Sequence, residues 1–289
     1  MKQKKWLLLL LTSLLISSCG TQTAGEIPET VTVRIAILDS GISTMAVNSE
    51  SLEEGLNGIR PFSATEDTTG HGTAVASIIV GSESAGIEGI CPQAVLIPLV
   101  YCEKDYLGRT VNADAETVGE LIRDAVDTFQ CDIINISAAS AKDDSSLRNA
   151  VEYAVEQGVI VVTCAGNTNL TTPDNVYYPG AYDGVICVGA VNPQGEVSDF
   201  SQRGEYLDFV APGEELPAAT MEGELTTVAG TSFSAAYVTG VIADLLSDEP
   251  DLSRQQEELQ QKLMELLKQR ARDIGRPGWD PDSGWGVLE

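Results

Sequence analysis

The stretch Val31-Thr-Val-Arg-Ile-Ala-Ile-Leu38 is a run of apolar and β-branched residues, followed directly by Asp39-Ser40-Gly41. Such a run is typical of a strand that is buried on both faces of a sheet. Similar runs recur along the chain, separated by segments with helical periodicity. Strands are predicted over 94–101, 132–137, 159–164 and 184–191, and helices from residue 73, over 113–129 and over 145–157. This alternation predicts a single α/β domain, with a parallel β-sheet sandwiched by helices.

The C-terminal part of the chain carries another helical pattern, over residues 253–274. Ser253 and Gln256 form a capping box at its start. Leucines spaced three and four residues apart form an apolar stripe, namely Leu259, Leu263, Leu266 and Leu267. A stripe of this kind serves a partner-binding helix or a helix packed on its own domain. Packing against the domain is the favoured interpretation.

Three polar residues stand where this fold places functional groups. Asp39 follows the first strand, and the carboxyl ends of parallel strands are where such sheets bind ligands. His71 is the single histidine of the chain and lies between two glycines at the start of a helix. Ser232 opens an apolar helix predicted to run to about Leu246. Each residue alone has a structural explanation, as a turn, a core histidine or a helix cap.

The local strings around these residues resemble the signature segments of the subtilase (S8) family of serine peptidases. The strings are Ala36-Ile-Leu-Asp-Ser-Gly41, Gly70-His-Gly-Thr-Ala-Val-Ala76 and Gly230-Thr-Ser232. Their order, Asp then His then Ser, is that of subtilisin. Further similar segments are Ala165-Gly-Asn167, Tyr178-Pro-Gly180 and Asp208-Phe-Val-Ala-Pro-Gly213. The resemblance covers about Val31 to Leu288 and implies a subtilisin-like three-layer fold over residues 31–289.

The resemblance also implies a role for each residue. Ser232 would attack the scissile carbonyl, and His71 would take its proton and return it to the leaving amine. Asp39 would fix the tautomer of the imidazole and stabilise its cation. The side-chain amide of Asn167, with the Ser232 N–H, would hold the oxyanion. The expected function is therefore that of a serine endopeptidase, with a peptide or protein as substrate.

The expected substrate contacts lie on two segments and one side chain. The substrate backbone would add as a strand along Ser137, Ala138 and Ala139, and Ala165 and Gly166 would line the cleft. Ala139 stands where relatives usually have Gly. Tyr177 occupies a position near the base of the S1 pocket that is often small. Tyr177 therefore either fills this pocket and favours small P1 residues, or turns outward against the Tyr178 turn.

Residues 1–18 are predicted to be an export signal. Lys2, Lys4 and Lys5 precede an apolar run from Trp6 to Ile16, which is too short for a membrane span. Ile16-Ser-Ser-Cys-Gly20 resembles a bacterial lipobox, so Cys19 is the expected lipidation site. Residues 19–30 would form a flexible tether. The expected location is the outer face of the bacterial cytoplasmic membrane, or the periplasmic side in a double-membrane organism.

The charge of the chain restricts its partners. The formal net charge is −26, and removal of the signal would subtract three more cations. Such a surface repels nucleic acid, so no nucleic-acid partner is expected. It would favour cationic peptides at low salt. We expect a monomer held to the membrane by its lipid.

The cysteines and acids show no metal-binding spacing. Five cysteines remain after Cys19, and the sequence has no CxxC and only one histidine, which argues against a zinc site. Cys131, Cys164 and Cys187 adjoin apolar runs and are predicted to be buried thiols. A Cys91–Cys102 disulfide stays open. The resemblance implies no cofactor for catalysis, and structural calcium stays an open alternative that no pattern in the sequence supports.

Two alternatives accompany the peptidase interpretation. One is a non-catalytic peptide-binding lipoprotein on the same fold, suggested by the altered cleft and by the lack of a pro-domain segment between Cys19 and Val31. The other is an acyl hydrolase with a nucleophile elbow, but the sequence around Ser232 lacks the Gly-x-Ser-x-Gly string.

Overall fold

The computed structural model describes residues 32–248, 252 and 258–289. Its centre is a seven-stranded sheet with the strand order β2-β3-β1-β6-β7-β8-β9, in which every neighbouring pair is parallel. The strands are β1 Arg34–Asp39, β2 Leu56–Asn57, β3 Val95–Val100, β6 Ile133–Ile136, β7 Ile160–Cys164, β8 Val185–Val191 and β9 Phe209–Pro212. The parallel sheet predicted from the apolar runs is confirmed.

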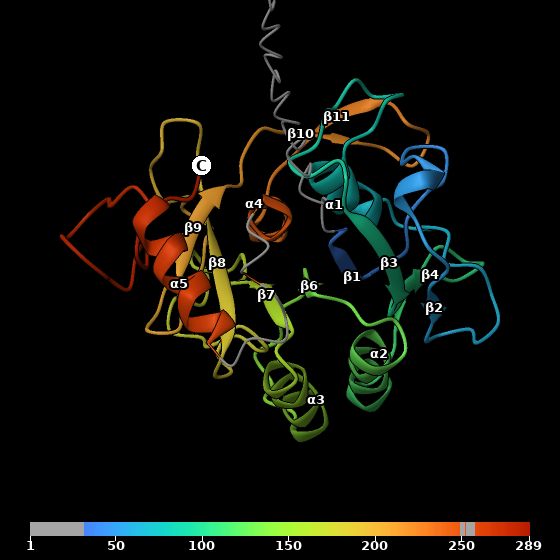
Figure 1. The fold of residues 1–289 in the computed structure, drawn as a ribbon, viewed down its shortest axis with the longest axis horizontal. Helices are drawn as coiled ribbons and strands as arrows, with labels where there is room; N and C mark the ends of the chain where they lie inside the picture. Colours follow the sequence, from blue (N-terminus) through green and yellow to red (C-terminus); the bar gives the residue numbers. More distant parts are fainter. Residues whose placement is uncertain (1–31, 249–251, 253–257) are drawn as a thin grey trace, which may run out of the picture.

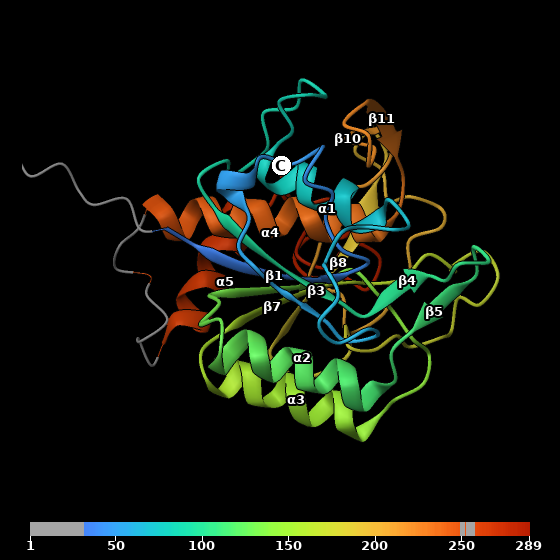
Figure 2. The same ribbon diagram turned by 90° about the vertical axis from the view of Figure 1, so that its right-hand side faces the viewer.

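Helices cover both faces of this sheet (Figures 1 and 2). The helices are α1 His71–Val80, α2 Ala115–Asp127, α3 Ser145–Glu156, α4 Thr231–Asp248 and α5 Leu259–Arg270, with a short 3₁₀ turn at Ser49–Ser51. On one face, α2 and α3 pack apolar residues such as Ile122 and Val151 against the sheet. The other face carries α1, α4 and α5. The result is the three-layer arrangement expected for a strongly apolar parallel sheet.

The two helices that begin at the predicted site are buried on most of their surface. All residues of α1 after His71 are buried, and so are fourteen of the eighteen residues of α4. A helix that is apolar all round must lie inside a protein or a membrane. Here α4 packs on α1 and on strands β6 to β9. Within the described part of the chain, no helix has the length and apolarity needed to cross a bilayer.

The C-terminal helix ends earlier than predicted. The structure gives α5 as Leu259–Arg270, four residues short of the predicted end at 274, and the capping box of Ser253 and Gln256 lies outside the described residues. Leu259, Leu263 and Leu267 are buried in the core beside α4, so this helix packs on its own domain. The last residues continue onto the sheet, where the Leu288 N–H donates to Val210 O.

Small elements surround the carboxyl edge of the sheet. The hairpin of β4 Cys102–Lys104 and β5 Thr110–Asn112 follows β3, and the hairpin of β10 Leu216–Ala219 and β11 Leu225–Val228 precedes α4. Neither was predicted, because these strands are short and partly exposed.

None of the five described cysteines is in a disulfide. Cys91, Cys131, Cys164 and Cys187 are buried, as the apolar runs predicted for the last three. The Cys91–Cys102 disulfide does not form. Cys91 precedes β3 and Cys102 follows it, so a six-residue strand of about 20 Å separates them, whereas bridged Cα atoms lie within about 7 Å.

Candidate active site

Asp39 and His71 meet at the carboxyl edge of the sheet. Asp39 is the last residue of β1, between β3 and β6, and its side chain is buried. His71 is the first residue of α1, and its Nδ1 lies 2.8 Å and 2.9 Å from the two carboxylate oxygens of Asp39. The Ser40 N–H donates to Asp39 Oδ1 at 2.8 Å, which fixes the carboxylate from the other side. This arrangement leaves Nε2 of the imidazole as the atom available to a substrate or nucleophile.

The surroundings of the imidazole favour its charged form. Burial by itself would lower the pKa of His71, but the charge and hydrogen bond of Asp39 and the charge of Asp67 outweigh it and raise that pKa. A base whose cation is stabilised in this way can accept a proton without losing its position.

A glycine makes the close approach of α1 to β1 feasible. A Cβ at Gly72 would lie 2.2 Å from the carbonyl oxygen of Gly41 and 3.1 Å from the Cβ of Asp39. No side chain fits there without moving the helix. The glycine after His71 is therefore required by the packing of α1 against the end of β1.

Ser232 lies in the first turn of α4 and faces the same site. Its neighbour Phe233 packs on the His71 ring with centroids 5.2 Å apart, so the start of α4 lies beside the imidazole. The Ser232 hydroxyl donates to the Ser137 carbonyl at 3.2 Å. Nucleophile–base hydrogen bonds are often loose in unliganded enzymes. A rotation about χ1 would redirect the hydroxyl.

Asn167 is positioned by its oxygen, which leaves its amide nitrogen free. Its Oδ1 accepts hydrogen bonds from the N–H and the hydroxyl of Thr231, both at 2.9 Å. The amide NH₂ therefore points away from Thr231, near Gly230, where a Cβ would lie 3.4 Å from it. The Ser232 N–H belongs to the first turn of α4, whose N–H groups lack helical acceptors. The Asn167 amide and the Ser232 N–H are thus both located at the start of α4.

The segment after β6 offers a free backbone edge next to Ser232. The Ser137 hydroxyl lies within hydrogen-bond distance of Asn135 Oδ1 and of the Ser232 carbonyl, which ties this segment to α4. Ser140 pairs with Tyr178 through two backbone hydrogen bonds of 2.8 and 2.9 Å. Ala138 and Ala139 line a cavity of about 400 Å³ together with apolar residues of α2 and α3.

Tyr177 is buried against Gly166 and does not turn outward. A Cβ at Gly166 would lie 3.2 Å from the Tyr177 ring, so ring and backbone are in contact. The phenol is bonded to Thr168 Oγ1 at 2.6 Å and accepts from the Asn175 amide at 3.3 Å. These contacts fix the Tyr177 ring against the backbone of the segment that contains Gly166 and Asn167.

Ala165, one of the predicted contact residues, has a buried side chain. The methyl group of Ala165 is fully buried in a cluster with Cys187 and Leu207. Successive side chains along an extended segment point to opposite sides, so the side chain of Ala165 faces the core and only its backbone is near the cleft.

Sequence reasoning missed Asp67, which is buried in the loop before α1 and bonded to Ser40, the residue after Asp39. The signal was an Asp followed by Thr-Thr-Gly just before a helix, a pattern typical of a carboxylate that binds nearby N–H groups.

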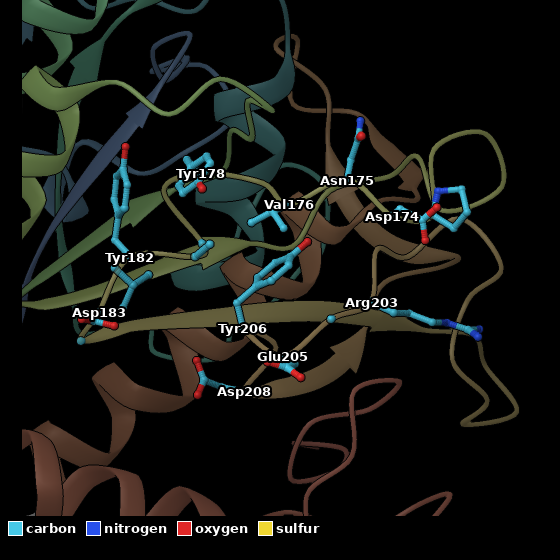
Figure 3. Close-up of a pocket in the computed structure, with 16 residues that line it drawn as sticks. Asp174, Asn175, Val176, Tyr178, Tyr182, Asp183, Arg203, Glu205, Tyr206 and Asp208 are labelled. Atoms are coloured by element: carbon cyan, nitrogen blue, oxygen red, sulfur yellow. The ribbon is translucent and has the colours of Figure 1, made fainter.

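A second cavity, of about 770 Å³, lies on the other side of the Tyr178–Pro179 turn and contains no residue of the Asp39–His71–Ser232 site (Figure 3). Burial raises the pKa of its Asp208 to about 6, and Oδ2 of this residue accepts the Cys187 N–H at 2.9 Å. Asp174 and Asp183 lie at opposite ends of the view. Among the described residues, no three His, Cys, Asp or Glu side chains converge as metal ligands would.

Comparison with known sequences identifies the family. The model of the subtilase family (Peptidase S8) matches residues 31–286. The chain is 33% identical over 244 residues to the major intracellular serine protease of Bacillus subtilis (strain 168), covering 81% of this chain and 72% of that protein. It is 31% identical over 258 residues to the minor extracellular protease Epr of the same organism. That match covers 89% of this chain but spans only 38% of the length of Epr.

Solved structures share the fold. Fervidolysin from Fervidobacterium pennivorans, a keratinolytic enzyme related to subtilisin, superposes with a TM-score of 0.78 at 27% identity, covering 90% of this chain and 42% of that one. The protease domain of PatA gives a TM-score of 0.73 at 29% identity, covering 89% and 92% of the two chains. The chain belongs to the subtilase family and has the fold and enzyme class of a subtilisin-like serine peptidase.

Proposed function

We propose that this chain is a serine endopeptidase in which Asp39, His71 and Ser232 form the catalytic triad. The observation that carries the proposal is the pairing of His71 with Asp39 at the carboxyl edge of the sheet, with the first turn of α4 packed on the same imidazole. Nucleophile, base and orienting carboxylate come from three elements far apart in sequence, as the triad chemistry requires.

Each step of acyl transfer has a group in place. His71 Nε2 takes the proton of the Ser232 hydroxyl as its oxygen attacks the peptide carbonyl, and Asp39 stabilises the resulting imidazolium. The proton then passes to the departing amine, which leaves an acyl-enzyme on Ser232. Water attacks this ester with the same base assistance and releases the second product.

The oxyanion is held by the amide of Asn167 and the N–H of Ser232. The Asn167 oxygen is already engaged by Thr231, so the amide is fixed before substrate arrives. Preorganised donors of this kind need no rearrangement in the transition state. Loss of the equivalent side-chain donor in subtilisin costs roughly 10²–10³ in turnover.

The substrate backbone is proposed to add as a strand along Ser137, Ala138 and Ala139. This segment has a free edge, and its carbonyl at Ser137 faces the nucleophile. With Tyr177 against Gly166, we propose that the S1 pocket accepts small side chains. The negative net charge favours basic residues around the scissile bond at low salt.

The proposed site of action is outside the cytoplasmic membrane, with Cys19 carrying the lipid. This proposal rests on the lysine-rich start, the short apolar run and the Ile16-Ser-Ser-Cys-Gly20 segment, all of which lie outside the described residues. An exported peptide is the proposed substrate.

Labelling with a fluorophosphonate probe, followed by peptide mapping, tests the enzyme hypothesis. The proposal requires modification of Ser232 in the folded wild type and its loss in Ser232→Ala. Absence of labelling in folded protein would instead support the non-catalytic peptide-binding alternative.

A further inference from the structure

A second buried carboxylate lies beside the triad, on the loop that carries His71. Asp67 is only 7% exposed. Its carboxylate accepts hydrogen bonds from the N–H groups of Thr69, Gly70 and Thr73 at 2.8, 3.0 and 2.9 Å. It also accepts the hydroxyl of Thr73 at 2.6 Å and that of Ser40 at 2.8 Å. Five donors therefore converge on one side chain just before α1.

The Ser40 bond connects this loop to the turn after Asp39. Besides donating to Asp67, the Ser40 oxygen accepts from the Gly72 N–H at 3.0 Å and from the Thr69 hydroxyl at 2.7 Å. The Thr69 oxygen in turn accepts the His71 N–H at 3.2 Å. The backbone on both sides of His71 and the residue next to Asp39 are thus fastened to the same carboxylate.

Asp67 is ionised in this setting. Burial by itself would raise its pKa, but the hydrogen bonds from Thr73, Thr69 and Gly70 outweigh burial and hold that pKa below the usual range. Its negative charge lies near the first turn of α1, where the helix dipole favours an anion. Asp39 and Asp67 are the two charged groups whose fields raise the pKa of His71.

We propose that Asp67 is a positioning residue for His71, which acts through Ser40 and Thr69 to hold the imidazole against Asp39. The proposal rests on the proposed function, because it assigns His71 the role of general base. Asp67 touches neither substrate nor nucleophile.

The chain's single histidine allows a direct test. In protein prepared without a histidine tag, His71 gives the only imidazole NMR signals, and their titration is followed in a Ser232→Ala background. Asp67→Asn keeps the side-chain shape but removes the charge and one acceptor. We expect the titration midpoint of His71 to fall by about one pH unit. With Ser232 intact, kcat should fall about tenfold or more with KM within twofold, and the acidic limb of kcat/KM should move to lower pH.

Asp280→Asn is the matched control. Asp280 is also buried and accepts three N–H groups, from Arg276, Asp282 and Ser283, and the Ser283 hydroxyl. It lies in the C-terminal loop, where Trp285 donates to the Asp208 carbonyl just before β9 and Gly286 accepts from Val210 of β9. This variant should lose stability but keep the His71 titration and the kcat of the folded enzyme.

The outcomes separate the two proposals. An unchanged His71 titration and kcat in folded Asp67→Asn would overturn the positioning role while leaving the triad intact. Full activity of Ser232→Ala would overturn the proposed function itself. Should Asp67→Asn not fold, Ser40→Ala decides, because it keeps the carboxylate and its backbone donors. A fall in kcat of about threefold or more at constant KM supports the positioning role, and an unchanged kcat rejects it.

Discussion

At the scale of single residues, the proposed preference for small P1 side chains depends on Tyr177. Its ring contacts the backbone at Gly166, and its phenol is tied to Thr168 and Asn175. Close-packed walls relax little, and forcing extra volume into them costs about 1–3 kcal/mol. If Tyr177 lines the S1 pocket as proposed, a large P1 side chain would compete with the ring for the same space.

The first prediction concerns this ring. Peptides matched except for Ala or Phe at P1 should show a higher kcat/KM for Ala in wild type, and Tyr177→Gly should shift the ratio toward Phe by about tenfold or more. Tyr177→Phe is the control, since it removes the phenol bond and keeps the ring, and it should retain the preference for Ala. A wild type that prefers Phe, or a ratio unmoved in Tyr177→Gly, would contradict the role of the ring.

Asp208 gives a prediction about pH. Burial raises its pKa to about 6, so ionisation of Asp208 costs free energy in the folded state and little in the unfolded state. This penalty is absent at low pH and grows as the pH rises from about 4 through 6. Asp208→Asn keeps an oxygen for the Cys187 N–H and cannot ionise. Its free energy of unfolding should exceed that of wild type by about 1–3 kcal/mol at pH 8, and the difference should shrink toward pH 4.

Urea unfolding at pH 4, 6 and 8 measures this difference. Asp114→Asn is a control in which the effect on stability should have the opposite sign. The Thr117 N–H lowers the pKa of the Asp114 carboxyl at the start of α2. The free energy of unfolding of Asp114→Asn, measured relative to wild type, should be lower at pH 8 than at pH 4. If Asp208→Asn were instead less stable than wild type at pH 8, the wild-type carboxylate would have a stabilising partner.

At the scale of elements, the sequence predicted the long strands and helices well and the short ones poorly. The strand predicted over 159–164 is β7, Ile160–Cys164, and the helix predicted over 145–157 is α3, Ser145–Glu156. Buried elements of this length carry many apolar residues in a clear period. The β4–β5 and β10–β11 hairpins have strands of three or four residues that are partly or fully exposed, so no apolar run marks them, unlike the buried four-residue strand β6.

The residues of the candidate site also differ in how far the sequence predicts them. Asp39, His71 and Ser232 stand in distinctive local strings, so the sequence alone is enough to single them out. Asp67 interacts with Ser40, 27 residues away, and the side-chain direction of Ala165 depends on how β8 and β9 pack. Contacts of this kind depend on tertiary structure, which no local pattern contains.

The apolar stripe of α5 gives a prediction at this scale. Leu263 is buried in the core beside α4, so Leu263→Ala should lower the free energy of unfolding by about 2–5 kcal/mol. Gln261→Ala, on the exposed side of the same helix, should change it by no more than about 0.5 kcal/mol. Chemical denaturation of both variants measures the difference. Equal stability of the two would mean that α5 is not part of the cooperative unit.

At the scale of the whole molecule, the last prediction concerns attachment. Cys19→Ala should abolish incorporation of labelled fatty acid and move the protein from the membrane fraction to the medium or periplasm. The released domain should unfold at the same urea concentration as the wild type, because the described fold begins after residue 31. Identical partitioning of wild type and variant between membrane and soluble fractions would reject the lipobox interpretation.

The direction of β1 has a geometric consequence for an anchored enzyme. This strand begins at Arg34 on one edge of the sheet and ends at Asp39 on the carboxyl edge, about 20 Å away. An anchor joined to the chain before Thr32 would therefore attach on the face opposite the cleft. If residues 19–30 form the proposed tether, which reaches at most about 40 Å, the cleft would meet only those segments of a membrane protein that project from the bilayer within this range. Height above the bilayer would then help to decide which bond is cut, together with the side chains around that bond.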